Sequence, residues 1–144
     1  MEELIESMKR TFAVHFQFYV KAHGFHVNIV GMNFPQYHEL LGKIYEHAQN
    51  EIDHLGEQIR AIEGIAPFSM ARIMELGDIK DSKERPKAMD MMKELFADSQ
   101  TLENHYMESY DLAEEYNAAG LCNYLGQLID THKKYQWMLR STLE

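Results

Sequence analysis

Two histidines and two carboxylates in the first half of the chain are of the types that bind transition metals. His26 and His38 lie twelve residues apart, on either side of a Gly-Met-Asn turn. Asp53 and Glu57 are separated by one helical turn, so they repel each other when both are ionised, and a divalent cation would remove that repulsion. Imidazole with carboxylate is the ligand set of iron, manganese and zinc. The four residues together therefore favour a metal site.

Each of these features has a plainer interpretation when it occurs alone. A single acid pair on a helix is usually a solvated polar edge, and a single inward histidine is usually a hydrogen-bonded core residue. His38 and Asp53 also lie roughly 22 Å apart along one helix axis, so they cannot bind the same ion in one chain. A second chain, packed antiparallel across a two-fold axis, would bring the histidines of one subunit to the carboxylates of the other. The sequence thus predicts either no site or a shared one.

The first histidine belongs to a long apolar pattern near the N-terminus. Apolar residues recur at helical spacing from Leu4 until Gly31 can end the helix. His23 and His26 fall on the apolar face of this helix, and His15 lies at its edge. All three are therefore expected to point inward.

The second helix is predicted to begin at Asn33, which we expect to act as its cap ahead of Pro35, and to end at Gly64. One border of its apolar stripe is a line of polar or small residues: His38, Gly42, Glu46, Gln49, Asp53 and Glu57. The second histidine and both carboxylates therefore lie on one strip of this helix.

The second half of the chain predicts two more long helices. One starts near Pro86, and Gly120 separates it from the last, which runs past Leu139. The link over residues 65–85 holds a short amphipathic piece, "FSMARIMEL", and could reach roughly 70 Å if extended. The second helix is only about 45 Å long, so the link can cross the whole bundle. An all-α, ferritin-like four-helix bundle with one long crossover is the expected fold.

Length and composition limit the function classes. The 144 residues predict a single domain over residues 1–144, and the formal charge of −9 disfavours nucleic acid and anionic membranes as partners. One cysteine, Cys122, excludes an intrachain disulfide and fits a reducing compartment. No signal peptide, membrane span or basic terminal tail is expected, so we predict a cytoplasmic protein.

Two familiar motifs are incomplete in this chain. "HELLG" begins like the zinc-protease motif, but Gly42 stands where that motif needs its second histidine. "EIDH" places Glu51 and His54 in the Glu-x-x-His spacing of di-iron bundles, yet no second copy exists, and solvated surface is the expected role of both residues. Two further histidines are also expected to face outward: His47 and His105.

With His26, "NIVGMNFPQYH", the Asp53 and Glu57 pair and "WMLRS" assembled, the whole chain resembles the Dps family of ferritin-like mini-cages. The resemblance implies hollow shells of twelve subunits with a short extra helix in the long link. It implies oxidation of Fe(II), usually by hydrogen peroxide and otherwise by O₂, at sites shared across two-fold interfaces, with storage of ferric mineral. By position, His26 and His38 of one subunit and Asp53 and Glu57 of the other would be the catalytic ligands.

The chain departs from the family pattern at two positions. The family has an aspartate one turn after the second histidine, where this chain has Gly42, and a tryptophan where it has Val27. Either water or Glu46 completes the second metal position, or His23 does, or the site holds one ion firmly and a second weakly. A site rich in imidazole would also bind zinc, which would then compete with iron.

Three functions remain open from the sequence: a ferroxidase storage cage, a metal-binding or structural cage whose oxidation site has decayed through Gly42, and a bundle that carries heme or another cofactor. DNA binding is expected to be weak, except through divalent ions that bridge to phosphate. Candidates for acidic iron pores are Glu108, Asp111, Glu114, Glu115 and Asp130.

Overall fold

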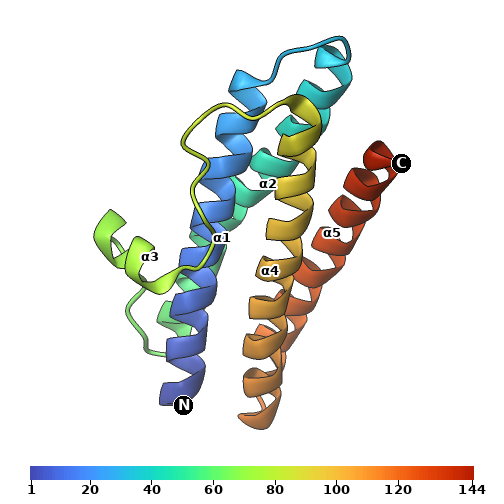
Figure 1. The fold of residues 1–144 in the computed structure, drawn as a ribbon. Coiled ribbons are helices and arrows are strands. Elements are labelled where there is room, and N and C mark those ends of the chain that lie inside the picture. The colour runs from blue at the N-terminus through green and yellow to red at the C-terminus, as the bar shows by residue number, and fades with distance from the viewer.

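The computed structural model describes all 144 residues, and they form helices and connecting segments without any strand. The helices are α1 (Glu2–Asn28), α2 (Phe34–Ala61), α3 (Met70–Leu76), α4 (Ala88–Glu115) and α5 (Ala119–Leu143). Figure 1 shows α1 and α2 as one antiparallel hairpin and α4 and α5 as another, with the short α3 lying outside the bundle against α1. The predicted all-α, ferritin-like bundle is confirmed.

The helices begin and end near the positions that the sequence predicts, but not always because of the residues that were expected to cause the break. Asn33 stands at the N-cap of α2, yet its side chain makes no capping bond and instead donates to the Tyr37 hydroxyl at 3.4 Å. Gly31 has a φ of +129°, which lets the chain turn between α1 and α2. Gly120 lies inside the first turn of α5, so the break before that helix is made by Asn117 at φ 57°. The position of the Asn33 cap is thus confirmed without a capping side-chain bond, whereas the predicted break at Gly120 was wrong.

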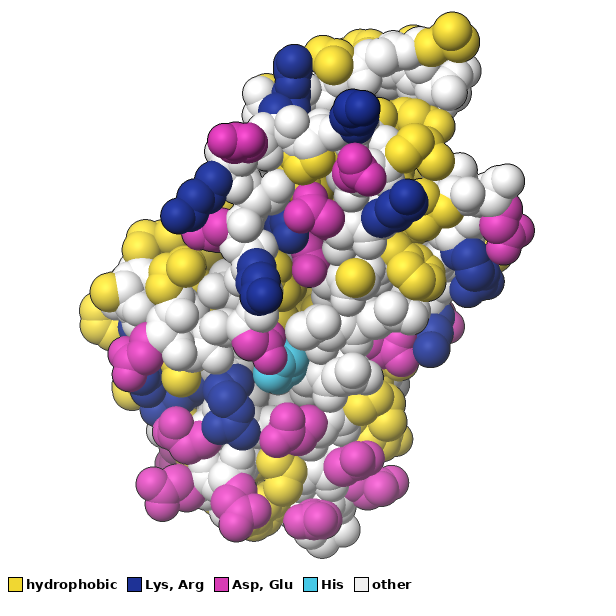
Figure 2. Space-filling model, in the orientation of Figure 1, with side chains coloured by type: hydrophobic (Ala, Val, Ile, Leu, Met, Phe, Trp, Pro, Cys, Tyr) yellow, Lys and Arg dark blue, Asp and Glu magenta, His cyan; other side chains and the backbone are white.

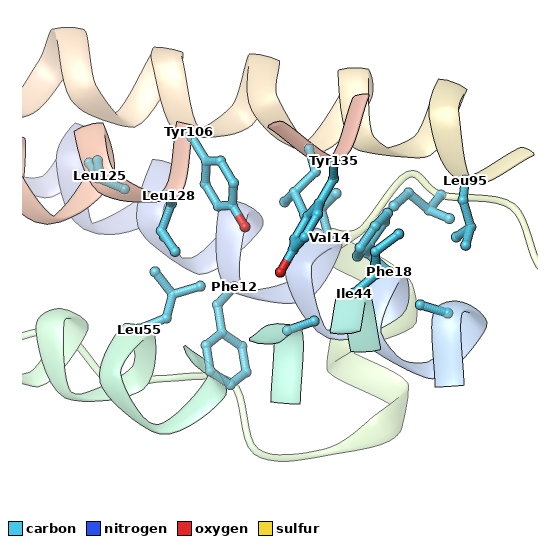
Figure 3. Close-up of a cluster of buried hydrophobic side chains, with 14 of the residues drawn as sticks. Phe12, Val14, Phe18, Ile44, Leu55, Leu95, Tyr106, Leu125, Leu128 and Tyr135 are labelled. Atoms are coloured by element: carbon cyan, nitrogen blue, oxygen red, sulfur yellow. The ribbon is translucent and has the colours of Figure 1, made fainter. Parts of the chain in front are cut away.

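The core is formed by the apolar stripes of the four long helices, which meet along the bundle axis. Figure 3 shows side chains from all four of them converging, among them Phe18, Ile44, Leu95 and Leu128. Burial of this apolar surface is what holds the two hairpins together.

The crossover from α2 to α4 passes along the outside of α1, as Figure 1 shows. Ile73 of α3 and Ile79 beyond it are buried, and the Gln17 side chain of α1 accepts a hydrogen bond from the Ile79 backbone N–H at 3.1 Å. The crossover is thus fixed to the bundle by apolar contacts and by at least one buried polar bond. None of the five helices combines the length and the apolar character that crossing a membrane requires.

Candidate metal site

His26, near the end of α1, and His38, in the first turns of α2, face each other across the turn that joins the helices. Their rings stack with centroids 3.7 Å apart and an interplanar angle of 16°. Nδ1 of His26 bonds to the backbone oxygen of His38 at 2.7 Å, and Nδ1 of His38 bonds to the backbone oxygen of His26 at 2.8 Å. A carbonyl only accepts, so each Nδ1 carries the proton. In the neutral rings both Nε2 atoms are then free to bind metal.

Gly42 lies against the His26 ring. A Cβ at this position would come within 3.1 Å of Cε1 and 3.3 Å of Nδ1 of His26. The Cβ of any larger residue at position 42, including an aspartate, would therefore crowd the His26 ring. The absence of a side chain at Gly42 allows the close approach of the His26 ring to α2.

Asp53 and Glu57 are exposed neighbours in the second half of α2. The pKa of the Glu57 carboxyl is raised because it shares a hydrogen bond with the Asp53 carboxyl and because the two charges repel. This is the conflict that a bound cation would relieve. No three side chains of His, Cys, Asp or Glu gather closely enough in one chain to hold a metal ion. As the spacing along α2 predicted, the histidine pair and the carboxylate pair do not meet within a subunit.

His23 and Glu46 do not join the histidine pair in a single chain. His23 bonds through Nδ1 to the Tyr19 hydroxyl at 2.9 Å, and its ring stacks on Tyr45 at 3.9 Å. Tyr45 also contacts His26, with centroids 4.9 Å apart. Glu46 is exposed. His23 thus belongs to an aromatic cluster beside the site.

Three residues that we expected on the outer surface are partly buried. His47 is half-buried, with its Nδ1 enclosed, and its ring contacts His132 of α5. The His105 side chain is only 16% exposed and forms an ion pair with Asp78 at 3.0 Å. Both predictions were wrong, because the stripe of one helix does not show what the crossover and α5 place over its flanks.

Glu51 is the third residue that was expected on the surface and is partly buried. Its carboxylate accepts a hydrogen bond from the Tyr124 hydroxyl at 2.8 Å, and its side chain is 19% exposed. His54 is 64% exposed, as predicted. Of the Glu-x-x-His pair, Glu51 therefore lies in the contact between α2 and α5, and His54 lies on the surface.

A layer of polar side chains crosses the middle of the bundle; the inward position of His15 was predicted, but its hydrogen-bond partners in other helices were not. His15 is fully buried, with Nδ1 bonded to the Tyr106 hydroxyl at 2.6 Å and Nε2 donating to the Ala48 carbonyl at 2.7 Å. Burial lowers its pKa from 6.5 to about 4, so the ring is neutral. His132 is also fully buried and bonds through Nδ1 to Ser99 at 2.8 Å. The available sequence signal was the recurrence of histidine, serine and tyrosine within otherwise apolar stripes.

Comparison with known proteins identifies the family. A model of the ferritin-like domain matches residues 5–144. A DNA protection during starvation protein of Brevibacillus brevis is 30% identical over 126 residues, which cover 88% of this chain and 85% of that protein. The chain belongs to the Dps family of ferritin-like proteins. The crystal structure of a Dps protein from Bacillus brevis matches at 28% identity with a TM-score of 0.94, covering 99% of this chain and 96% of that one. Antigen TpF1 from Treponema pallidum matches at 26% identity with a TM-score of 0.95, covering 99% and 92%.

Four of the five acidic residues that we suggested as pores in this Dps chain lie around two separate hollows, whereas Glu115 is exposed and lines neither. Glu114 and Asp130 line a hollow beside the α4–α5 turn, whereas Glu108 and Asp111 line another beside the start of α1. Figure 2 shows acidic side chains gathered at the end of the molecule that holds the N-terminus. Which of these residues admit iron stays a prediction.

Proposed function

We propose that this protein oxidises Fe(II) and stores the ferric product inside a shell of identical subunits. The observation that carries the proposal is the reciprocal bonding of His26 and His38, which occupies both Nδ1 atoms and leaves the Nε2 atoms of two stacked rings as candidate metal ligands. Membership of the ferritin-like, Dps-type family supports iron as the substrate.

The site is completed by a second subunit across a two-fold axis. His26 and His38 of one subunit bind Fe(II) together with Asp53 and Glu57 of the partner subunit. The two anionic carboxylates favour the ferric state because oxidation adds a positive charge to the ion beside them. A cluster with no negative ligand would lack this driving force, which is why both halves are needed.

The oxidant is hydrogen peroxide, with O₂ as the alternative. Two ferrous ions supply the two electrons that cleave the O–O bond: 2 Fe(II) + H₂O₂ + 2 H⁺ gives 2 Fe(III) + 2 H₂O. Because Gly42 contributes no carboxylate, the second ion is held more weakly than the first. Zinc competes for the same imidazoles.

The biological role is to remove ferrous iron and peroxide together, which prevents them from producing hydroxyl radicals. The shell contains twelve subunits, following the family, and the compartment is the reducing cytoplasm. The formal charge of −9 makes direct binding to DNA weak.

Stopped-flow absorbance tests the proposal. Protein preloaded anaerobically with Fe(II) is mixed with peroxide, and wild type is compared with Asp53→Ala and with Asp90→Ala, which removes an exposed acid of α4. Fast oxidation that is lost only in Asp53→Ala is the expected result. Equally slow traces for all three proteins would overturn the ferroxidase and favour the alternative function, a metal-binding cage without an oxidation centre.

A further inference from the structure

Two enclosed imidazole nitrogens, one on α2 and one on α5, have no hydrogen-bond partner: Nδ1 of His47 and Nε2 of His132. His132 is fully buried between the helices, and the two ring centroids lie 6.3 Å apart at an interplanar angle of 66°. An unpaired buried polar atom is costly, so native proteins retain few of them. Neither residue takes part in the proposed shared site.

The His132 ring is held in one orientation by a chain of hydrogen bonds. Its Nδ1 bonds to Ser99 Oγ at 2.8 Å, and Gln136 Nε2 donates to the same oxygen at 3.2 Å. Gln136 is itself anchored by Glu103 at 2.9 Å. A histidine whose second nitrogen is fixed in this way is typical of metal ligands, whose outer partners set the ring orientation. His15 differs, because both of its nitrogens are occupied.

Glu51 supplies a negative charge beside His47. It follows His47 by one turn of α2, so the two side chains lie on the same face of that helix. Its hydrogen bonds from Tyr124 at 2.8 Å and from His54 at 3.3 Å both go to Oε2, which leaves Oε1 available.

We propose that His47, His132 and Glu51 bind a divalent transition-metal ion such as zinc inside each bundle, in addition to the site between subunits. Zinc binds imidazole nitrogen at about 2.0 to 2.1 Å with tetrahedral geometry, so two rings that share one ion have centres roughly 5 to 5.5 Å apart. The observed distance is 6.3 Å, so the half-buried His47 ring must rotate toward His132 to share the ion. Glu51 must turn inward to bind, since no three such side chains gather in the present arrangement. Burial lowers the pKa of both histidines and thereby maintains the neutral form that binds metal.

The test uses a protein whose shared site has been removed, so that its outcome is independent of iron oxidation. Untagged Asp53→Ala/His38→Ala protein is dialysed against zinc and its metal content is measured. We expect one zinc ion per chain, at least tenfold weaker binding after His132→Leu or His47→Leu, and unchanged binding after His105→Asn. Less than stoichiometric zinc, or binding that the leucine variants do not weaken, would overturn the proposal.

A second measurement needs no core substitution and so does not depend on the folding of the leucine variants. Zinc K-edge X-ray absorption of the zinc-loaded Asp53→Ala/His38→Ala protein reports the ligands directly. Scattering from two imidazole rings with one or two carboxylate oxygens is expected. A first shell of water and carboxylate oxygens alone would show that the zinc lies elsewhere, on the acidic surface.

Discussion

Nδ1 of His26 and Nδ1 of His38 each bond to the other residue's backbone carbonyl, at 2.7 and 2.8 Å. The two bonds join the end of α1 to the start of α2 across the Gly31 turn. They also fix the tautomer of each ring. A carbonyl oxygen can only accept a hydrogen bond, so each Nδ1 must carry the proton. One pair of interactions therefore closes the helical hairpin and leaves the Nε2 atoms of both rings without a hydrogen-bond partner.

Gly42→Ala should separate the effect of the ring position from the effect of the missing ligand. Alanine supplies no metal ligand, but its Cβ would lie 3.1 Å from Cε1 of His26 and push the ring away by a few tenths of an ångström. We expect oxidation in the stopped-flow assay to slow by roughly three- to tenfold because catalysis is sensitive to small misplacements. The gain in helix propensity, up to about 1 kcal/mol, should keep the melting temperature from falling.

An unchanged oxidation rate in Gly42→Ala would show that the close approach of His26 has no catalytic value. Gly42→Asp then provides the comparison: it carries the same steric cost but supplies a carboxylate one helical turn after His38. Faster oxidation in Gly42→Asp than in Gly42→Ala is the expected order.

Tyr106→Phe should destabilise the bundle without altering its shape. The substitution removes the hydroxyl that bonds to Nδ1 of His15 at 2.6 Å and leaves a fully buried nitrogen unpaired. Such a loss costs about 1 to 3 kcal/mol. Denaturant unfolding measures it, with Tyr110→Phe as control, since Tyr110 lies one turn later on α4 and is only partly buried. A similar loss in both variants would contradict a special role for the pair of Tyr106 and His15.

The fold and the separation of the histidine pair from the carboxylate pair within one chain could be predicted from the sequence because both depend on spacing along single helices. Fifteen positions of one helix separate His38 from Asp53, and no packing detail changes that separation. The inward position of His26 followed in the same way from the apolar face of its helix.

What could not be predicted depends on contacts between elements distant in the sequence. The sequence pattern predicts Glu51 as solvated surface, but Tyr124 of α5 covers it. His105 is covered because the crossover brings Asp78 to it. The steric role of Gly42 likewise requires the position of the His26 ring, which belongs to another helix. A periodic pattern assigns a residue to a face but not to the neighbour that covers that face.

Alanine substitutions at two glycines should change the stability of the protein in opposite directions. A Cβ at Gly64 would lie 2.7 Å from Ile5 Cγ2 and 2.9 Å from Ile59 Cγ2, so Gly64→Ala overpacks the end of the hairpin and should cost about 1 to 3 kcal/mol. Gly126 lies within α5, and no side chain or neighbouring element lies within 4 Å of the added carbon, so Gly126→Ala should stabilise the protein by up to about 1 kcal/mol. Thermal unfolding measures both, and a stabilising Gly64→Ala would show that the hairpin end is loosely packed.

Stability should fall with pH on the acid side because of the buried histidines. The pKa of His15 is lowered from 6.5 to about 4 by burial, and that of His132 is lowered by burial and by the neighbouring imidazoles. At pH values between the ordinary histidine pKa and the lowered one, the unfolded chain binds more protons than the folded chain. The free energy of unfolding therefore decreases as the pH falls. The slope is at most about 1.4 kcal/mol per pH unit for each histidine.

Denaturant unfolding of wild type and His132→Leu at a series of pH values between about 6.5 and 5 tests this dependence, since these pH values lie below the ordinary histidine pKa. The variant lacks one of the titrating groups and retains every carboxylate, so its stability should depend less steeply on pH, by up to about 1.4 kcal/mol per unit. Its absolute stability is not the readout, because the loss of the Ser99 bond and the gain of apolar burial act in opposite directions. Parallel slopes for the two proteins would mean that His132 takes up no more protons in the unfolded chain than in the bundle.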